Sequence, residues 1–125
     1  MTKKKILIVE DNEQNLYLTT FLLEKQGYDV VQVRNGEEGL DLAVAERPDL
    51  ILLDIQLPVM DGYEVSRRLK QAQETQSIPI VAVTSYAMAG DREAVLAAGC
   101  EGYIEKPIDP ERFVEQVKGF LRNEK

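Results

Sequence analysis

Leu50-Ile-Leu-Leu-Asp54-Ile-Gln-Leu-Pro58-Val-Met-Asp61-Gly62 is the stretch around which this chain is organised. Its four consecutive apolar residues are typical of a strand that is buried on both faces. Asp54 places a charge at the end of that strand. Because Pro58 cannot continue a central strand and Gly62 accepts any turn, the chain leaves the sheet directly after the carboxylate. We therefore expect Asp54 to lie at the rim of a sheet.

Short apolar strands alternate with helices along the rest of the chain. Strands are predicted at residues 6–9, 29–33, 50–54, 80–84 and 102–105, and helices at 13–26, 36–47, 62–74, 89–98 and from 110 onward. This alternation predicts an α/β fold, with a five-stranded parallel sheet covered by five helices on both faces. The expected strand order is 2-1-3-4-5, a doubly wound, flavodoxin-like arrangement. One domain over residues 1–125 is expected.

Helix ends and apolar faces are marked by the residue types that usually occupy them. Asn35, Asp61 and Asp109 are predicted N-caps, and Gly27 and Gly99 are predicted to end helices. The helix at 89–98 has the weakest apolar face. The predicted inward positions of the other helices are Leu16, Thr20 and Leu23; Leu40, Ala43 and Val44; Val65, Leu69 and Ala72; and Phe113, Val117, Phe120 and Leu121.

Composition limits the class of protein. A chain of 125 residues with 44% hydrophobic and 30% charged residues is long enough for one buried core. Its net charge of −7 argues against a nucleic-acid partner and favours a partner with a basic or apolar face. The single Cys100 cannot form an internal disulfide, so a reducing compartment and a small buried side chain are expected. No signal peptide or stretch of ~20 apolar residues is present, which predicts a cytoplasmic protein without membrane contact.

Reactive groups follow the predicted strands at their carboxyl ends. Glu10 and Asp11 follow the first strand, Asp54 ends the third, Thr84 ends the fourth and Lys106 follows the fifth. In a doubly wound sheet these groups meet at one edge. Two like charges about 4 Å apart repel by roughly 4 kcal/mol at a protein surface, so three carboxylates require a cation, and Mg²⁺ suits carboxylate oxygens. A hydroxyl and an ammonium beside the metal would bind a phosphoryl group, which a carboxylate can accept as an aspartyl phosphate.

These residues resemble the response-regulator receiver domain of two-component signalling. The matching motifs are Glu10-Asp11, Leu-Asp54-Ile-Gln-Leu-Pro-Val-Met-Asp-Gly, Thr84-Ser85 and Lys106-Pro107, in the order and approximate spacing of the family. The resemblance covers the entire chain. It implies phosphorelay signal transduction, in which Asp54 accepts a phosphoryl group from a histidine kinase or a histidine phosphotransfer protein.

The resemblance also implies roles around the acceptor. Asp11, Asp54 and the backbone carbonyl of Gln56 would bind Mg²⁺, and Glu10 would act mostly through water. Glu10 stands where many members of the family carry Asp. Lys106 would hold a phosphoryl oxygen, and its peptide bond to the following proline, Lys106-Pro107, is expected to be cis.

The resemblance also implies a conformational switch and residues that set how long the phosphate stays bound. Thr84 would move to the phosphoryl group and Tyr103 would turn inward. The face formed by the fourth helix, the fifth strand and the fifth helix would then bind a downstream protein. Gln56 and Tyr86 would flank the path of attacking water, and the bulk of Tyr86 predicts slow loss of phosphate. Beyond self-catalysed phosphoryl acceptance and slow autodephosphorylation, no enzymatic activity is expected.

Alternative interpretations differ in what the acceptor does. The chain starts at Met1 and ends at Lys125 after the last helix, which favours a stand-alone switch, monomeric or dimeric on phosphorylation, over a receiver cut from a hybrid kinase. A metal-dependent phosphatase resembling the haloacid dehalogenase group needs a second Asp two residues after the first, where this chain has Gln56. A binding module that never takes phosphate would be expected to lack Asp54, Thr84 or Lys106.

Overall fold

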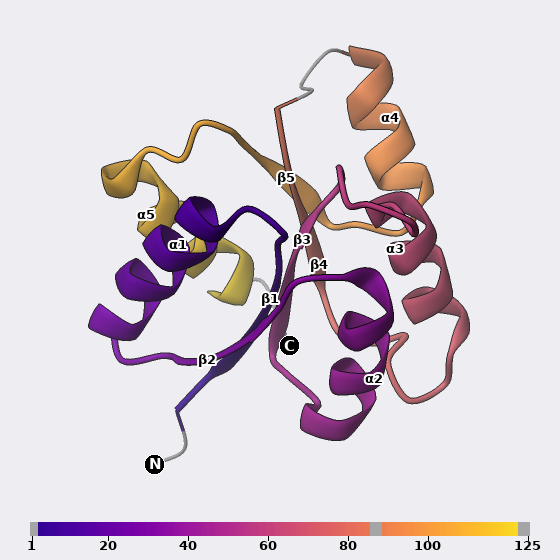
Figure 1. Cartoon of the computed structure of the whole chain (residues 1–125), viewed down its shortest axis with the longest axis horizontal. Helices are drawn as coiled ribbons and strands as arrows, with labels where there is room; N and C mark the ends of the chain where they lie inside the picture. The colour runs from indigo at the N-terminus through magenta and orange to yellow at the C-terminus, as the bar shows by residue number, and fades with distance from the viewer. Residues whose placement is uncertain (1–2, 86–88, 123–125) are drawn as a thin grey trace.

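Five parallel strands form one sheet, with helices on both faces (Figure 1). The computed structural model describes residues 3–85 and 89–122. The strands are β1 (Lys5–Val9), β2 (Asp29–Val33), β3 (Leu50–Asp54), β4 (Ile80–Thr84) and β5 (Gly102–Glu105), in the order β2-β1-β3-β4-β5. The helices are α1 (Glu13–Lys25), α2 (Gly36–Glu46), α3 (Gly62–Gln71), α4 (Ala89–Ala97) and α5 (Pro110–Arg122). The predicted α/β fold and strand order are confirmed.

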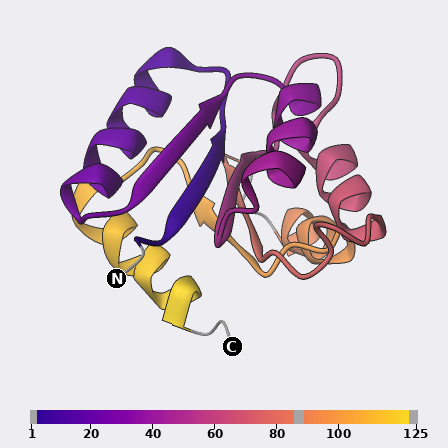
Figure 2. The ribbon, with the colours of Figure 1, turned by 90° about the horizontal axis from the view of Figure 1, so that it is seen from below.

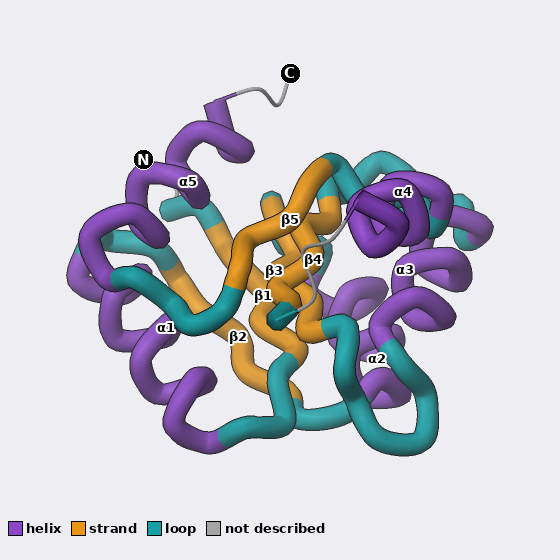
Figure 3. Tube along the Cα trace, turned by 90° about the horizontal axis from the view of Figure 1, so that it is seen from above, coloured by secondary structure: helices purple, strands orange, loops and turns teal. Residues whose placement is uncertain are grey.

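The sheet separates two hydrophobic clusters. Helices α1 and α5 cover one face, and α2, α3 and α4 cover the other (Figures 2 and 3). Because successive side chains of a strand point to opposite faces, Ile6 and Ile8 pack under α1 and α5, whereas Leu7 and Val9 pack under α2 and α3. Burial of the central strands on both faces explains why their sequences are continuously apolar.

Side-chain caps fix where the helices begin. Asn35 Oδ1 accepts the Glu38 N–H at 2.9 Å and Asp61 Oδ1 accepts the Glu64 N–H at 3.0 Å, as predicted. Asn12, which was not predicted as a cap, accepts the Asn15 N–H at 2.9 Å and so starts α1 next to the acidic pair.

Two predicted inward positions are wrong. Val44 is 42% exposed, because α2 packs on the sheet through the small residues Gly36, Gly39 and Ala43. A Cβ on Gly39 would lie 3.1 Å from a methyl group of Val9, so the helix approaches β1 closely along that stripe. In α1 the buried threonine is Thr19 rather than Thr20, whose hydroxyl instead accepts a hydrogen bond from the Gln32 amide at 2.8 Å.

Helix α3 ends at Gln71, three residues before the predicted end at Glu74. The Thr75 hydroxyl donates to the Leu69 carbonyl at 2.6 Å, in place of the N–H that a longer helix would supply. The Lys70 ammonium donates to the Ile78 carbonyl at 2.8 Å and fastens the following loop. Ala72 is therefore an extended C-cap and is only half-buried.

Cys100 lies in the core between α3 and α4. It is 5% exposed, in agreement with the expected small buried side chain, and its sulfur lies 3.4 Å from the Ser66 hydroxyl. Burial raises the pKa of the Cys100 thiol. Within the described residues, none of the helices is both long enough and apolar enough to cross a bilayer.

Candidate functional site

Three strands deliver charged side chains to the carboxyl edge of the sheet. The Glu10 N–H donates to the Val33 carbonyl at 3.1 Å and extends the β1 ladder by one residue, while Asp54 ends β3. The Lys106 N–H donates to the Thr84 carbonyl at 2.8 Å, just past β5. Each of Glu10, Asp54 and Lys106 lies two residues after a residue that faces α1 and α5. Because side chains alternate along a strand, all three point to that same face. They therefore converge on one side of the edge.

The three carboxylates and the ammonium lie within a few ångströms of one another. Lys106 Nζ lies 3.2 Å from Glu10 Oε1 and 3.4 Å from Asp54 Oδ2. Glu10 and Asp54 are only 4% and 2% exposed, whereas Asp11 is exposed. One carboxylate oxygen from each of the three acids lies within 4.8 Å of the others. This set of hard oxygen donors fits Mg²⁺.

The electrostatics of Glu10 support that fit. Burial, followed by the hydrogen bond to Asp54 and the charge of Asp54, raises the pKa of Glu10 to about 7, although the Lys106 charge acts in the opposite direction. Burial and the neighbouring Asp54 thus outweigh the single ammonium beside Glu10. A divalent cation among these oxygens would favour the ionised form of all three acids.

The turn after β3 fixes the orientation of Asp54. The Gln56 N–H donates to Asp54 Oδ1 at 3.0 Å, so one carboxylate oxygen is held by the backbone while the other faces Lys106. The Gly62 N–H donates to the Ile55 carbonyl at 2.9 Å and closes the loop. A Cβ on Gly62 would lie 2.6 Å from both the Asp54 carbonyl oxygen and the Ile55 Cα, so only glycine fits.

A hollow of about 360 Å³ opens beside Asp54. Its lining combines the predicted residues Glu10, Asp11, Asp54, Gln56 and Lys106 with Asn12, Asn15 and Ser85. The two asparagines were not predicted as site residues. The sequence feature that could have indicated them is a helix cap, Asn12, directly after the acidic pair. The cap brings the first turn of α1 to the same edge of the sheet.

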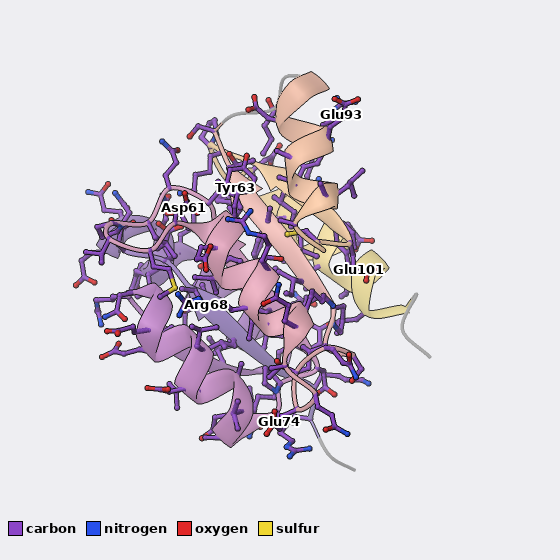
Figure 4. The ribbon with its side chains drawn as sticks, turned by 90° about the vertical axis from the view of Figure 1, so that its right-hand side faces the viewer. Asp61, Tyr63, Arg68, Glu74, Glu93 and Glu101 are labelled. Carbon is purple, nitrogen blue, oxygen red and sulfur yellow. The ribbon has the colours of Figure 1, made fainter. Side chains whose placement is uncertain are left out.

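Thr84 and Tyr103 lie on neighbouring strands, on the other face of the sheet. Tyr103 pairs with Ala82, two residues before Thr84, so both side chains point to the face under α2, α3 and α4. Figure 4 views this face, with Tyr63 and Arg68 labelled on α3. Thr84 is 2% exposed.

The remaining predicted residues are Pro107 and Tyr86. The Lys106–Pro107 peptide bond is cis, the isomer that the resemblance implied. Tyr86 lies outside the described residues.

Comparison with known proteins gives consistent matches. The family model of the response regulator receiver domain matches residues 6–118. The polar-differentiation response regulator DivK of Brucella anthropi is 52% identical over 118 residues, which cover 94% of this chain and 96% of that protein. DivK of Brucella ovis is 50% identical over the same shares.

Solved structures agree with the sequence matches. A CheY-like response regulator receiver domain protein from Methanospirillum hungatei has a TM-score of 0.90 at 33% identity, covering 98% of this chain and 97% of that one. The receiver domain of a sensor histidine kinase from Pseudomonas aeruginosa, with magnesium in its active-site cleft, has a TM-score of 0.89 at 34% identity, covering 98% and 100%. Because the family model matches residues 6–118 of the 125, the chain belongs to the response regulator receiver domains of two-component signalling.

Proposed function

We propose that the chain is a phosphorylation switch that accepts a phosphoryl group on Asp54 from the phosphohistidine of a histidine kinase or histidine phosphotransfer protein. The observation that best supports this proposal is the environment of the Asp54 carboxylate. It is a buried carboxylate with one oxygen bound by the Gln56 N–H at 3.0 Å and the other 3.4 Å from the Lys106 ammonium. It also lines a hollow of about 360 Å³ that is open to a donor.

The transfer joins an Asp54 carboxylate oxygen to phosphorus. As that bond forms, the bond from phosphorus to the donor imidazole nitrogen breaks, and its electron pair returns to the imidazole. The Lys106 ammonium binds a phosphoryl oxygen, and Thr84 then moves its hydroxyl toward another. Both roles rest on the place of these residues at the ends of β5 and β4.

A metal completes the proposed site. Asp11, Asp54 and the Gln56 carbonyl would hold Mg²⁺, with Glu10 acting through water, and the bound ion would supply positive charge to the phosphoryl oxygens. The clustered oxygens of Glu10, Asp11 and Asp54 support this assignment. So does the magnesium ion in the cleft of the Pseudomonas aeruginosa receiver domain.

The output is proposed to be protein binding. Movement of Thr84 and Tyr103 alters the face formed by α4, β5 and α5, which then binds a downstream protein. The match to the DivK relative from Brucella anthropi covers 96% of that protein. That relative therefore consists almost entirely of the matched region. The net charge of −7 favours a protein partner over nucleic acid.

The lifetime of the phosphorylated form is proposed to depend on Gln56 and Tyr86. Side chains of this bulk would restrict the attacking water, so autodephosphorylation is slow and no further enzymatic activity is proposed. The half-life of the phosphorylated chain measures this. Tyr86→Ala should shorten the half-life, and an unchanged half-life in that variant would remove Tyr86 from the proposal.

Intact mass after incubation with acetyl phosphate tests the proposed function. We expect an adduct of one phosphoryl group that requires Mg²⁺ and disappears in Asp54→Asn. Asp61→Asn is the matched control, because it neutralises a nearby exposed acid while asparagine still caps α3. An adduct that persists in Asp54→Asn would refute the acceptor. Release of phosphate over many turnovers would favour the phosphatase interpretation instead.

A further inference from the structure

The first turn of α4 is largely exposed to solvent. Gly90, Arg92 and Glu93 are exposed and Asp91 is half-buried, and the first buried residue of the described part of the helix is Val95. A Cβ on Gly90 would meet nothing within 4 Å. Figure 1 shows α4 beside β5, and Figure 4 labels Glu93 on this turn. The turn therefore takes little of its position from apolar packing.

A cation–π contact joins this turn to the sheet. The Arg92 guanidinium carbon lies 5.4 Å from the centroid of the Tyr103 ring on β5, within the range of a cation–π interaction. Tyr103 is half-buried and packs against the core cluster under α2, α3 and α4. It also borders a hollow of about 590 Å³ that extends to Arg112 and Gln116 on α5. Tyr103 thus contacts Arg92 on α4 and borders a hollow that it shares with α5.

From these contacts we infer that Arg92 is a positioning residue, which holds the Tyr103 ring and couples the first turn of α4 to β5. The inference rests on the proposed function, in which Tyr103 is the ring that turns on phosphorylation. Tyr103 pairs with Ala82, two residues before Thr84, so a rearrangement at the end of β4 reaches the ring through adjacent strands. Arg92 then transmits the movement of the ring to α4.

The size of the effect follows from the exposure of Arg92. A cation–π contact at an exposed site changes the ratio of two conformations by about two- to fivefold. That is enough to bias a switch and too little to prevent it from turning. Lysine keeps the charge but lacks the planar group that stacks on a ring, so Arg92→Lys should retain only part of the coupling.

Amide hydrogen exchange of the unphosphorylated chain tests the contact directly. The N–H groups of Ala94 and Val95 pair, in helical spacing, with carbonyls of the first turn, so their exchange reports its opening. Arg92→Met should accelerate their exchange by about two- to fivefold, and Arg92→Lys by less. Arg112→Met is the matched control, because it also removes an exposed arginine charge, from the hollow that Tyr103 borders. It should leave the exchange unchanged.

The phosphorylated chain tests the coupling. In the wild type, acetyl phosphate with Mg²⁺ should shift the NMR signals of both the Tyr103 ring and the Ala94 and Val95 amides. In Arg92→Met the ring signals should still shift, while the amide shifts fall by half or more. A purely structural role for Arg92 would leave the amide response intact.

Three outcomes would overturn the inference. They are unchanged exchange in Arg92→Met, equal acceleration in Arg112→Met, and a full amide response to phosphorylation in Arg92→Met. Failure of the proposed function would look different, because the wild type would then form no adduct at Asp54. The exchange comparison of unphosphorylated variants would still decide whether Arg92 holds the ring.

Discussion

Asp54 combines burial with a charge, and two neighbours make that combination tolerable. A buried carboxylate is costly unless it is hydrogen-bonded or paired with an opposite charge. The Gln56 N–H and the Lys106 ammonium provide one partner for each of its oxygens. The backbone positions both partners. The turn after β3 places the Gln56 N–H, and the end of β5 places Lys106. The orientation of the acceptor is therefore set before any ligand binds.

Gly62 should be the least replaceable residue of the turn. Gly62→Ala would place a Cβ 2.6 Å from the Asp54 carbonyl oxygen, so the end of β3 must move. We expect a loss of about 1–3 kcal/mol in the free energy of unfolding, measured by urea denaturation, together with slower adduct formation.

Gly90→Ala is the control for Gly62→Ala. A Cβ on Gly90 meets nothing within 4 Å, so alanine should raise the unfolding free energy by about 0.4–1 kcal/mol. Equal stability of the wild type and Gly62→Ala would show that the turn relaxes freely, and would contradict the tight contact.

The strands were more predictable than the helices. Four of the five predicted strands, including residues 50–54 and 80–84, have the observed bounds, and only β1 begins one residue earlier, at Lys5. A strand buried on both faces leaves a continuous apolar run in the sequence, and polar residues end it sharply. Local pattern is sufficient for such elements.

Helix ends and helix faces depend on partners that are distant in the sequence. The end of α3 is set by the Thr75 hydroxyl, and the face of α2 by the close approach of Gly39 to Val9. Neither contact follows from periodicity within one helix. The same limit explains why helical periodicity predicts an inward Val44 and a helical Ala72.

The Thr75 contact predicts a large effect of a nearly isosteric change. Thr75→Val removes the donor to the Leu69 carbonyl, which lies in the core, and should lower the unfolding free energy by about 1–3 kcal/mol. Thr20→Val is the control, since its hydrogen bond to Gln32 is exposed and its loss should stay within about 0.5 kcal/mol. Similar losses for the two variants in thermal denaturation would argue against a special role for Thr75.

The candidate site was predictable where strand ends converge and not where helices contribute. The sheet brings Glu10, Asp54 and Lys106 together because parallel strands end at one edge, and the sequence shows which residues follow each strand. Asn15 lines the hollow from α1, and Arg92 contacts the Tyr103 ring from α4. Their placement depends on how α1 and α4 dock on the sheet, which the sequence pattern alone does not specify.

For the molecule as a whole, the proposed acceptor and the proposed switch residues lie on opposite faces of the sheet. Glu10, Asp54 and Lys106 lie on the side of α1 and α5, whereas Thr84 and Tyr103 lie on the side of α4. The chain as a whole carries a net charge of −7. A cation bound at the acidic cluster should therefore stabilise the fold more than its single site suggests, because it also lowers the total repulsion.

Magnesium should raise the melting temperature of the unphosphorylated chain. At 100 times its dissociation constant, a ligand that binds only the folded state adds roughly 2.7 kcal/mol. Asp11→Asn should lose most of this gain, because it removes one of the three clustered carboxylates. Glu13→Gln, an exposed acid outside the cluster, should retain it. NaCl at equal ionic strength separates screening from binding, and an equal rise with NaCl would exclude a specific site.

The closed loop after β3 makes the acceptor tolerant of added chain length nearby. The hydrogen bond from the Gly62 N–H to the Ile55 carbonyl joins the two ends of the loop, and Val59 projects into solvent near its tip, at φ 68°. Doubling the length of a flexible loop costs only about 0.6 kcal/mol, so a short peptide inserted after Val59 should leave adduct formation intact. The same insertion between Ile55 and Gln56 would remove the backbone bond to Asp54 and should impair it. The tip of this loop is therefore a suitable place for a reporter peptide beside the proposed phosphoryl acceptor.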